Sequence, residues 1–105
     1  MKPLFFLLLL TGQLFAQEPI PANKQAILNS IAKHEKELIR ISDSVWSYAE
    51  IAMKEYRSAK ILSDYAEKQG FRVTRNVAKI PTAFIAEYGS GKPIIGILGE
   101  FDALQ

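Results

Sequence analysis

Two carboxylates, those of Glu100 and Asp102, stand two residues apart at the end of an apolar run that begins at Pro93. Residues i and i+2 of an extended strand point to the same face, so both side chains can face one site. Carboxylates in such a place can bind a hard or borderline cation, or hold a metal-ligating histidine by its second ring nitrogen. The alternative is a polar strand end that caps the next turn. The spacing alone does not separate these two interpretations.

The run over residues 93–102 predicts a strand that is hydrophobic on both faces. Such strands are typical of α/β proteins, in which both faces of the sheet are covered. Ligands of open α/β sheets bind beyond the carboxyl ends of the strands. The sequence ends at Gln105, shortly after Asp102. We therefore expect a site that begins at Glu100 and Asp102 and is completed by residues outside this chain.

Two helices are expected ahead of this strand. Apolar residues recur in steps of four and three from Ile27 to Tyr48, which predicts a helix over residues 24–49. Asn23 is a suitable N-cap, because its side chain can accept a hydrogen bond from the first turn. A second helix is predicted over residues 56–69, and Gly70 can end it in the left-handed conformation.

Two further strands are expected between the second helix and the apolar run. Residues 71–75 alternate in polarity, as a half-exposed strand does. A turn closed by Pro81 leads into a strand over residues 82–88, and residues 89–92 form the next turn. The expected fold class is α/β, with two N-terminal helices followed by three strands, as the first part of a larger catalytic domain.

Residues 1–16 have the layout of a secretory signal peptide. Lys2 gives a positive start, residues 4–10 are apolar, and Ala16 precedes the expected cleavage site. The apolar stretch falls short of the roughly 20 residues that a membrane span needs. We expect an exported protein, periplasmic or secreted, with no stable membrane anchor after cleavage. Residues 17–23 are expected to be a linker, and residues 24–105 an incomplete part of the catalytic domain.

The length of the chain allows one small domain at most. The chain has 105 residues and a formal net charge of +2, and its basic residues are scattered among acids. A nucleic-acid partner is therefore not expected. Without the leader, 105 − 16 = 89 residues remain, and a domain of that size buries only about 60–65% of its unfolded surface. This small size favours a segment of a larger protein.

The remaining candidates have ordinary explanations. His34 is the only histidine and lies on the apolar stripe of the first helix, so we expect a core or edge histidine with one hydrogen-bond partner. Residues 89–92 resemble a phosphate loop, but a proline and a strand follow them instead of a helix. The helical aromatic residues are expected in the core rather than around a pocket, and three glutamates are expected to be solvated. These residues are Trp46, Tyr48, Tyr56 and Tyr65, and Glu50, Glu55 and Glu67.

Six segments within residues 45–104 occur in an order and spacing that resemble one family. The chain is similar there to the beginning of the aminobenzoyl-glutamate utilization protein B-like amidohydrolases, within the aminoacylase/carboxypeptidase-type zinc metallopeptidases. The matching segments are WSYAE (46–50), YRSA (56–59), GFRVTRNV (70–77), IPTAFIA (80–86), YGSGKP (88–93) and ILGEFDAL (97–104).

The resemblance implies a two-domain enzyme that hydrolyses amides of carboxylated substrates. A catalytic α/β domain would carry the metals, and a smaller inserted domain would serve as a lid and as the surface of a homodimer. The substrates implied are N-acyl amino acids, such as aminobenzoyl-glutamate. A divalent metal, zinc or manganese, would polarise the amide carbonyl and lower the pKa of bound water, and a glutamate would act as general base.

The resemblance carries roles over to two residues of this chain. Asp102 matches the strand-end aspartate that orients a metal-binding histidine or shapes the site from behind the metal ligands. Glu100 stands where relatives place the first metal ligand, a histidine or an aspartate. The other ligands and the catalytic glutamate are expected beyond Gln105, and a zinc site needs three or four protein groups. We therefore expect a segment of an amidohydrolase that is inactive alone. The alternatives are a small secreted binding or interaction module, and a truncated product without function.

Overall fold

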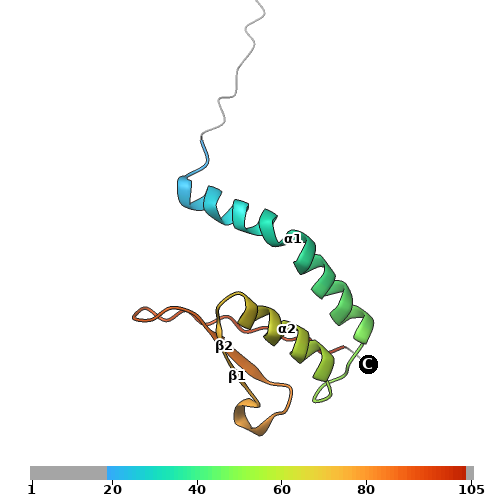
Figure 1. The fold of residues 1–105 in the computed structure, drawn as a ribbon. Coiled ribbons are helices and arrows are strands. Elements are labelled where there is room, and N and C mark those ends of the chain that lie inside the picture. Colours follow the sequence, from blue (N-terminus) through green and yellow to red (C-terminus); the bar gives the residue numbers. More distant parts are fainter. Residues whose placement is uncertain (1–18, 104–105) are drawn as a thin grey trace, which may run out of the picture.

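The computed structural model describes residues 19–103 of the chain (Figure 1). The expected signal peptide lies outside the described residues. Within them, no helix combines the length and the apolar character that crossing a membrane requires. The elements in order are α1 (Ala22–Tyr48), α2 (Tyr56–Lys68), β1 (Arg72–Arg75), a 3-10 turn (Val77–Lys79) and β2 (Phe84–Glu87).

Helix α1 confirms the first predicted helix, with a small difference at its start. The helix begins at Ala22, so Asn23 lies in the first turn and its side chain accepts the Lys24 amide at 2.8 Å. The predicted N-cap is therefore wrong by position. At the other end Ala49 adopts a left-handed conformation, with φ 47° and ψ 41°, which stops the helix. Only the C-terminal half of α1 faces another element, and Ile41 is buried there.

Helix α2 lies between α1 on one side and the two strands on the other (Figure 1). Its predicted end is confirmed, because Gly70 has a φ of +91°. The chain reverses there, and the Phe71 amide donates to the Ala66 carbonyl at 3.1 Å. Glycine adopts this left-handed conformation without the steric cost that a Cβ brings. The reversal starts β1 directly after the helix.

Strands β1 and β2 form an antiparallel pair, which confirms the first two predicted strands. The register pairs Arg72 with Glu87 and Arg75 with Phe84. Arg72 and Glu87 also form an ion pair, with 3.1 Å between the guanidinium nitrogen and the carboxylate oxygen. The coarse prediction of an α/β arrangement, with helices first and strands after them, is confirmed.

The third predicted strand is not formed in the described part of the chain. Residues 93–102 pair with neither β1 nor β2. Four aliphatic side chains of this segment are 83–95% exposed, namely Ile94, Ile95, Ile97 and Leu98. An apolar strand is stabilised by a neighbour for its backbone groups and by cover on its faces. One helix layer and a two-stranded sheet supply neither here, so residues 89–92 turn the chain without closing a hairpin.

The few buried side chains among residues 19–103 are mostly polar. Ile41 is the one buried apolar residue, whereas four buried residues carry a hydroxyl or a carboxylate. All buried side-chain polar atoms in this part of the chain have a hydrogen-bond partner. Hydrogen bonds therefore have an unusually large share in joining the elements. The four residues are Glu55, Ser58, Ser63 and Thr82.

Candidate functional site

The two predicted site residues lie where the extended segment returns to the body of the molecule. Glu100 and Asp102 are both exposed, whereas Phe101 and Ala103 are partly buried. The Phe101 ring packs against the ring of Phe84 in β2, with centroids 6.1 Å apart. The Ala103 amide donates to the Glu50 carbonyl at 2.7 Å, beside the loop that follows α1 (Figure 1). Asp102 is thus placed between two anchored neighbours.

The described residues do not supply a complete metal site. Nowhere in residues 19–103 do three or more histidine, cysteine, aspartate or glutamate side chains gather as metal ligands would. A zinc ion needs three or four protein ligands, so Glu100 and Asp102 do not fit a metal centre by themselves. The predicted roles of the two carboxylates stay predictions.

Glu50 caps the first turn of α2, a role that was not predicted from the sequence. This side chain was expected to be solvated, but it is half-buried and turned onto the first turn of α2. Its carboxylate accepts the Arg57 amide at 3.0 Å, and the Ser58 amide and hydroxyl at 2.8 Å each. Burial opposes ionisation of the group, but these hydrogen bonds outweigh it and hold the pKa of Glu50 below its usual value.

Glu55 was also expected to be solvated, and that prediction is wrong. Its side chain is only 8% exposed. One carboxylate oxygen accepts the Thr82 hydroxyl at 2.7 Å, and the other accepts the Met53 amide at 2.8 Å. The Thr82 hydrogen bond is the main cause that holds the pKa of Glu55 below its usual value, against the effect of burial. The carboxylate ties the α1–α2 loop to the chain just before β2.

A sequence signal for these two glutamates existed. Both precede the start of α2, where backbone amides lack helical partners and the helix dipole favours negative charge. The contact of Glu55 with Thr82 had no such signal, because the two residues are 27 positions apart.

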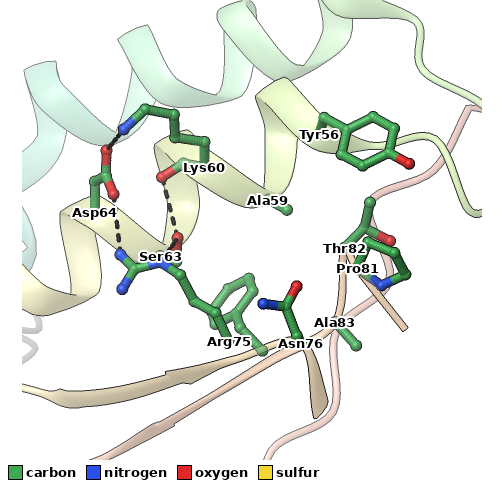
Figure 2. A pocket seen from close by; sticks show the side chains of 11 residues that line it. Tyr56, Ala59, Lys60, Ser63, Asp64, Arg75, Asn76, Pro81, Thr82 and Ala83 are labelled. Carbon is green, nitrogen blue, oxygen red and sulfur yellow. Dashed lines mark hydrogen bonds and ion pairs between the residues drawn. The ribbon is translucent and has the colours of Figure 1, made fainter. Parts of the chain in front are cut away.

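A hollow of about 280 Å³ lies between α2 and the strands (Figure 2). On one wall Asp64 bridges Lys60 and Arg75, and the Arg75 guanidinium also bonds to Ser63 and to Glu67. Glu67 is the main cause that raises the pKa of Arg75. These charges neutralise one another and clamp β1 onto α2. Neither Glu100 nor Asp102 lines this hollow.

His34 and the aromatic residues can now be placed. The Nδ1 atom of His34 lies 3.1 Å from the Tyr65 hydroxyl, which confirms a histidine with one hydrogen-bond partner. Tyr48 is half-buried, and the Arg57 guanidinium lies 3.8 Å from its ring centroid. The core prediction is wrong for Trp46 and for Tyr56, which are exposed.

Comparisons with known proteins bear on the resemblance. No family model matches the chain, and no solved structure matches it. It is similar to one of the subunits of p-aminobenzoyl-glutamate hydrolase from Escherichia coli (strain K12), with 52% identity over 64 residues, which are 61% of this chain and 13% of that protein. It is also similar to Thermostable carboxypeptidase 1 of Saccharolobus solfataricus, with 27% identity over 82 residues, 76% of this chain and 21% of that protein.

The chain thus spans less than a quarter of the length of either curated relative. The stretch of 64 residues at 52% identity is too long and too similar to arise from the ordinary composition of the chain. It is homologous to part of the p-aminobenzoyl-glutamate hydrolase of Escherichia coli and, at lower identity, to part of a carboxypeptidase, which confirms the resemblance that the six segments predict.

Proposed function

We propose that this chain is the N-terminal part of a metal-dependent amidohydrolase that cleaves N-acyl amino acids or aminobenzoyl-glutamate-type amides. The observation that carries the proposal is the 52% identity over 64 residues with the p-aminobenzoyl-glutamate hydrolase of Escherichia coli. The similarity to a carboxypeptidase supports the same reaction type, since both names describe hydrolysis of an amide bond next to a carboxylate.

In this proposal the apolar segment over residues 93–102 becomes a strand once further chain covers it. The high exposure of its aliphatic side chains supports this, because soluble proteins rarely leave such runs in water. Asp102 would orient a metal-binding histidine, and Glu100 would stand beside the metal. The remaining ligands for zinc or manganese belong to sequence after Gln105.

Export and dimer formation are part of the same proposal. The layout of residues 1–16 supports a cleaved leader, and mass spectrometry of the mature protein should then find Gln17 as its first residue. The Escherichia coli relative is named as one subunit of a hydrolase, which supports an oligomeric enzyme. We expect a homodimer, and sedimentation analysis measures it.

The test begins with the coding sequence that follows Gln105. We use the term extended protein for the polypeptide encoded by this chain together with the coding sequence that follows it. Incubation with p-aminobenzoyl-glutamate should release glutamate, and exhaustive chelation should abolish the release until Zn²⁺ or Mn²⁺ is restored. The 105-residue chain serves as the control and should be inactive. Release that survives exhaustive chelation would contradict the proposal.

A further inference from the structure

Three parts of the chain meet at Glu50. The residue follows Ala49, whose left-handed conformation ends α1. Both oxygens of its carboxylate are bonded to the first turn of α2, through the Arg57 and Ser58 amides and the Ser58 hydroxyl. Its main-chain carbonyl accepts the Ala103 amide at 2.7 Å. One residue therefore joins the end of α1, the start of α2 and the end of the apolar segment.

Helix α2 depends on Glu50 for its cap. The residue at the N-cap position is Glu55, and it makes no capping hydrogen bond with its side chain. Its carboxylate is engaged instead with Met53 and Thr82. The first amides of a helix lack partners within the helix, and Glu50 supplies them from outside. These bonds fix the Glu50 side chain, and with it the direction of the Glu50 carbonyl.

With residues 93–102 uncovered, as in the described structure, the position of Asp102 depends on its two neighbours. The segment before it is exposed, and an added Cβ at Gly96 or Gly99 would meet no atom within 4 Å. Phe101 packs on Phe84, and Ala103 bonds to Glu50. The peptide group directly after Asp102 is therefore held by the carbonyl of Glu50.

We propose that Glu50 is a positioning residue for Asp102. Its carboxylate, fixed on the first turn of α2, holds the carbonyl that anchors Ala103, and so sets where Asp102 presents its side chain. What Asp102 does at that place rests on the proposed function. The anchoring itself depends only on contacts within this chain, so the two can fail separately.

The anchoring is tested by hydrogen exchange in the extended protein. Glu50→Ala should reduce the protection of the Ala103 amide about 10-fold or more. Glu50→Gln keeps one acceptor oxygen, so it should give a smaller loss and partial rescue. The matched control is Asp64→Asn, which removes two ion pairs of α2 away from Glu50. It should leave Ala103 protected.

If Glu50→Ala fails to fold, Glu50→Gln still tests the anchoring. In Glu50→Gln the amides of β2 report folding, and Ala103 should lose protection while they keep theirs. Unchanged Ala103 protection in Glu50→Gln and in a folded Glu50→Ala would overturn the anchoring. An equal loss of Ala103 protection in Asp64→Asn would also overturn the anchoring, because the loss would then reflect general destabilisation of the fold.

The consequence for catalysis is measured in the same protein. Glu50→Ala, where it folds, should lower kcat about 10-fold or more with little change in KM, and Glu50→Gln should lower kcat by less. Both variants should shift the visible spectrum of the Co²⁺-substituted protein, because a displaced Asp102 would no longer orient the metal-binding histidine. Asp64→Asn should change neither kcat nor the spectrum. Loss of Ala103 protection with an unchanged kcat and spectrum would overturn the positioning role. Absence of both activity and metal binding in the unmutated protein would instead overturn the proposed function and leave the exchange result to decide the anchoring.

Discussion

At the scale of single residues, the molecule depends on carboxylates that the sequence presents as ordinary surface charges. Glu55 is nearly buried, yet both of its oxygens have donors, the Thr82 hydroxyl and the Met53 amide. Met53 has a φ of 66°, which an L-residue rarely adopts. The carboxylate thus stabilises a strained loop and ties it to the chain before β2.

Removing the hydroxyl of Thr82 should destabilise the fold. Thr82→Val keeps the shape of the side chain but leaves one oxygen of Glu55 buried without its donor. An unsatisfied buried group costs about 1–3 kcal/mol in free energy of unfolding, which denaturant melts of the extended protein measure. Thr74→Val is the matched control, because Thr74 lies exposed in β1. Equal melts for the two variants would contradict this role of Thr82.

The same carboxylates predict how stability depends on pH. The pKa values of Glu50 and Glu55 in the folded protein lie below their usual value of 4.5. Their contribution is therefore complete above that value and is lost as the pH falls through the lower folded values. Glu55→Gln should flatten this acid-side loss in melts between about pH 7 and pH 2. Glu87→Gln is the control, because it changes an exposed carboxylate on β2. It should keep the steep loss of stability at acid pH.

At the scale of elements, a local backbone conformation sets the C-terminal end of each helix. Ala49 directly follows α1, and Gly70 lies two residues after the end of α2 at Lys68; both have a positive φ. The α1–α2 loop is short, and its two glutamates bind in opposite directions, Glu50 onto α2 and Glu55 toward Thr82. Arg75 then clamps β1 to the far half of α2 (Figure 2).

Gly70 should be sensitive to substitution for conformational reasons alone. An added Cβ would meet Tyr88 at 3.7 Å, an ordinary contact, but the φ of +91° is unfavourable for any L-residue. Gly70→Ala should therefore lower the free energy of unfolding of the extended protein by about 1–2 kcal/mol. Denaturant melts of the extended protein measure this change. Gln69→Ala is the control, because Gln69 is exposed beside the same turn and its φ of −84° is one that alanine adopts without strain. A neutral Gly70→Ala would show that the turn adopts another conformation in solution.

At the scale of the whole molecule, the described residues bury little apolar surface. Ile41 is the one buried apolar side chain in residues 19–103. Exposed aliphatic residues line α1 and the segment over residues 93–102, among them Ile27, Ile31 and Ile97. Burial of apolar area is the dominant favourable contribution to folding. We therefore expect these surfaces to need cover before the fold is independently stable.

The 105-residue chain should accordingly unfold without a cooperative transition. Circular dichroism during urea titration should show a gradual loss of helix, because too little apolar surface is buried to oppose the entropy of the unfolded chain. The extended protein should show a sharp transition under the same conditions. A sharp transition of the short chain would instead favour the small secreted module as its function.

The elements whose cause is local could be predicted from the amino-acid order. The period of four and three predicted α1, Gly70 predicted the end of α2, alternation predicted β1, and the turn closed by Pro81 marked the start of the strand that contains β2. The six segments predicted the similarity to an aminobenzoyl-glutamate hydrolase and to a carboxypeptidase. Each of these signals lies within a short stretch of chain, so no knowledge of the fold was needed.

Features that depend on distant partners became visible only in the folded chain. The apolar run over residues 93–102 has the composition of a strand, but a strand also needs a neighbour, and neither described strand pairs with it. Glu55 resembles a solvated carboxylate until Thr82 is brought to it from 27 positions away. Composition reports what a residue can do, whereas pairing and burial depend on which other residues the fold brings within reach.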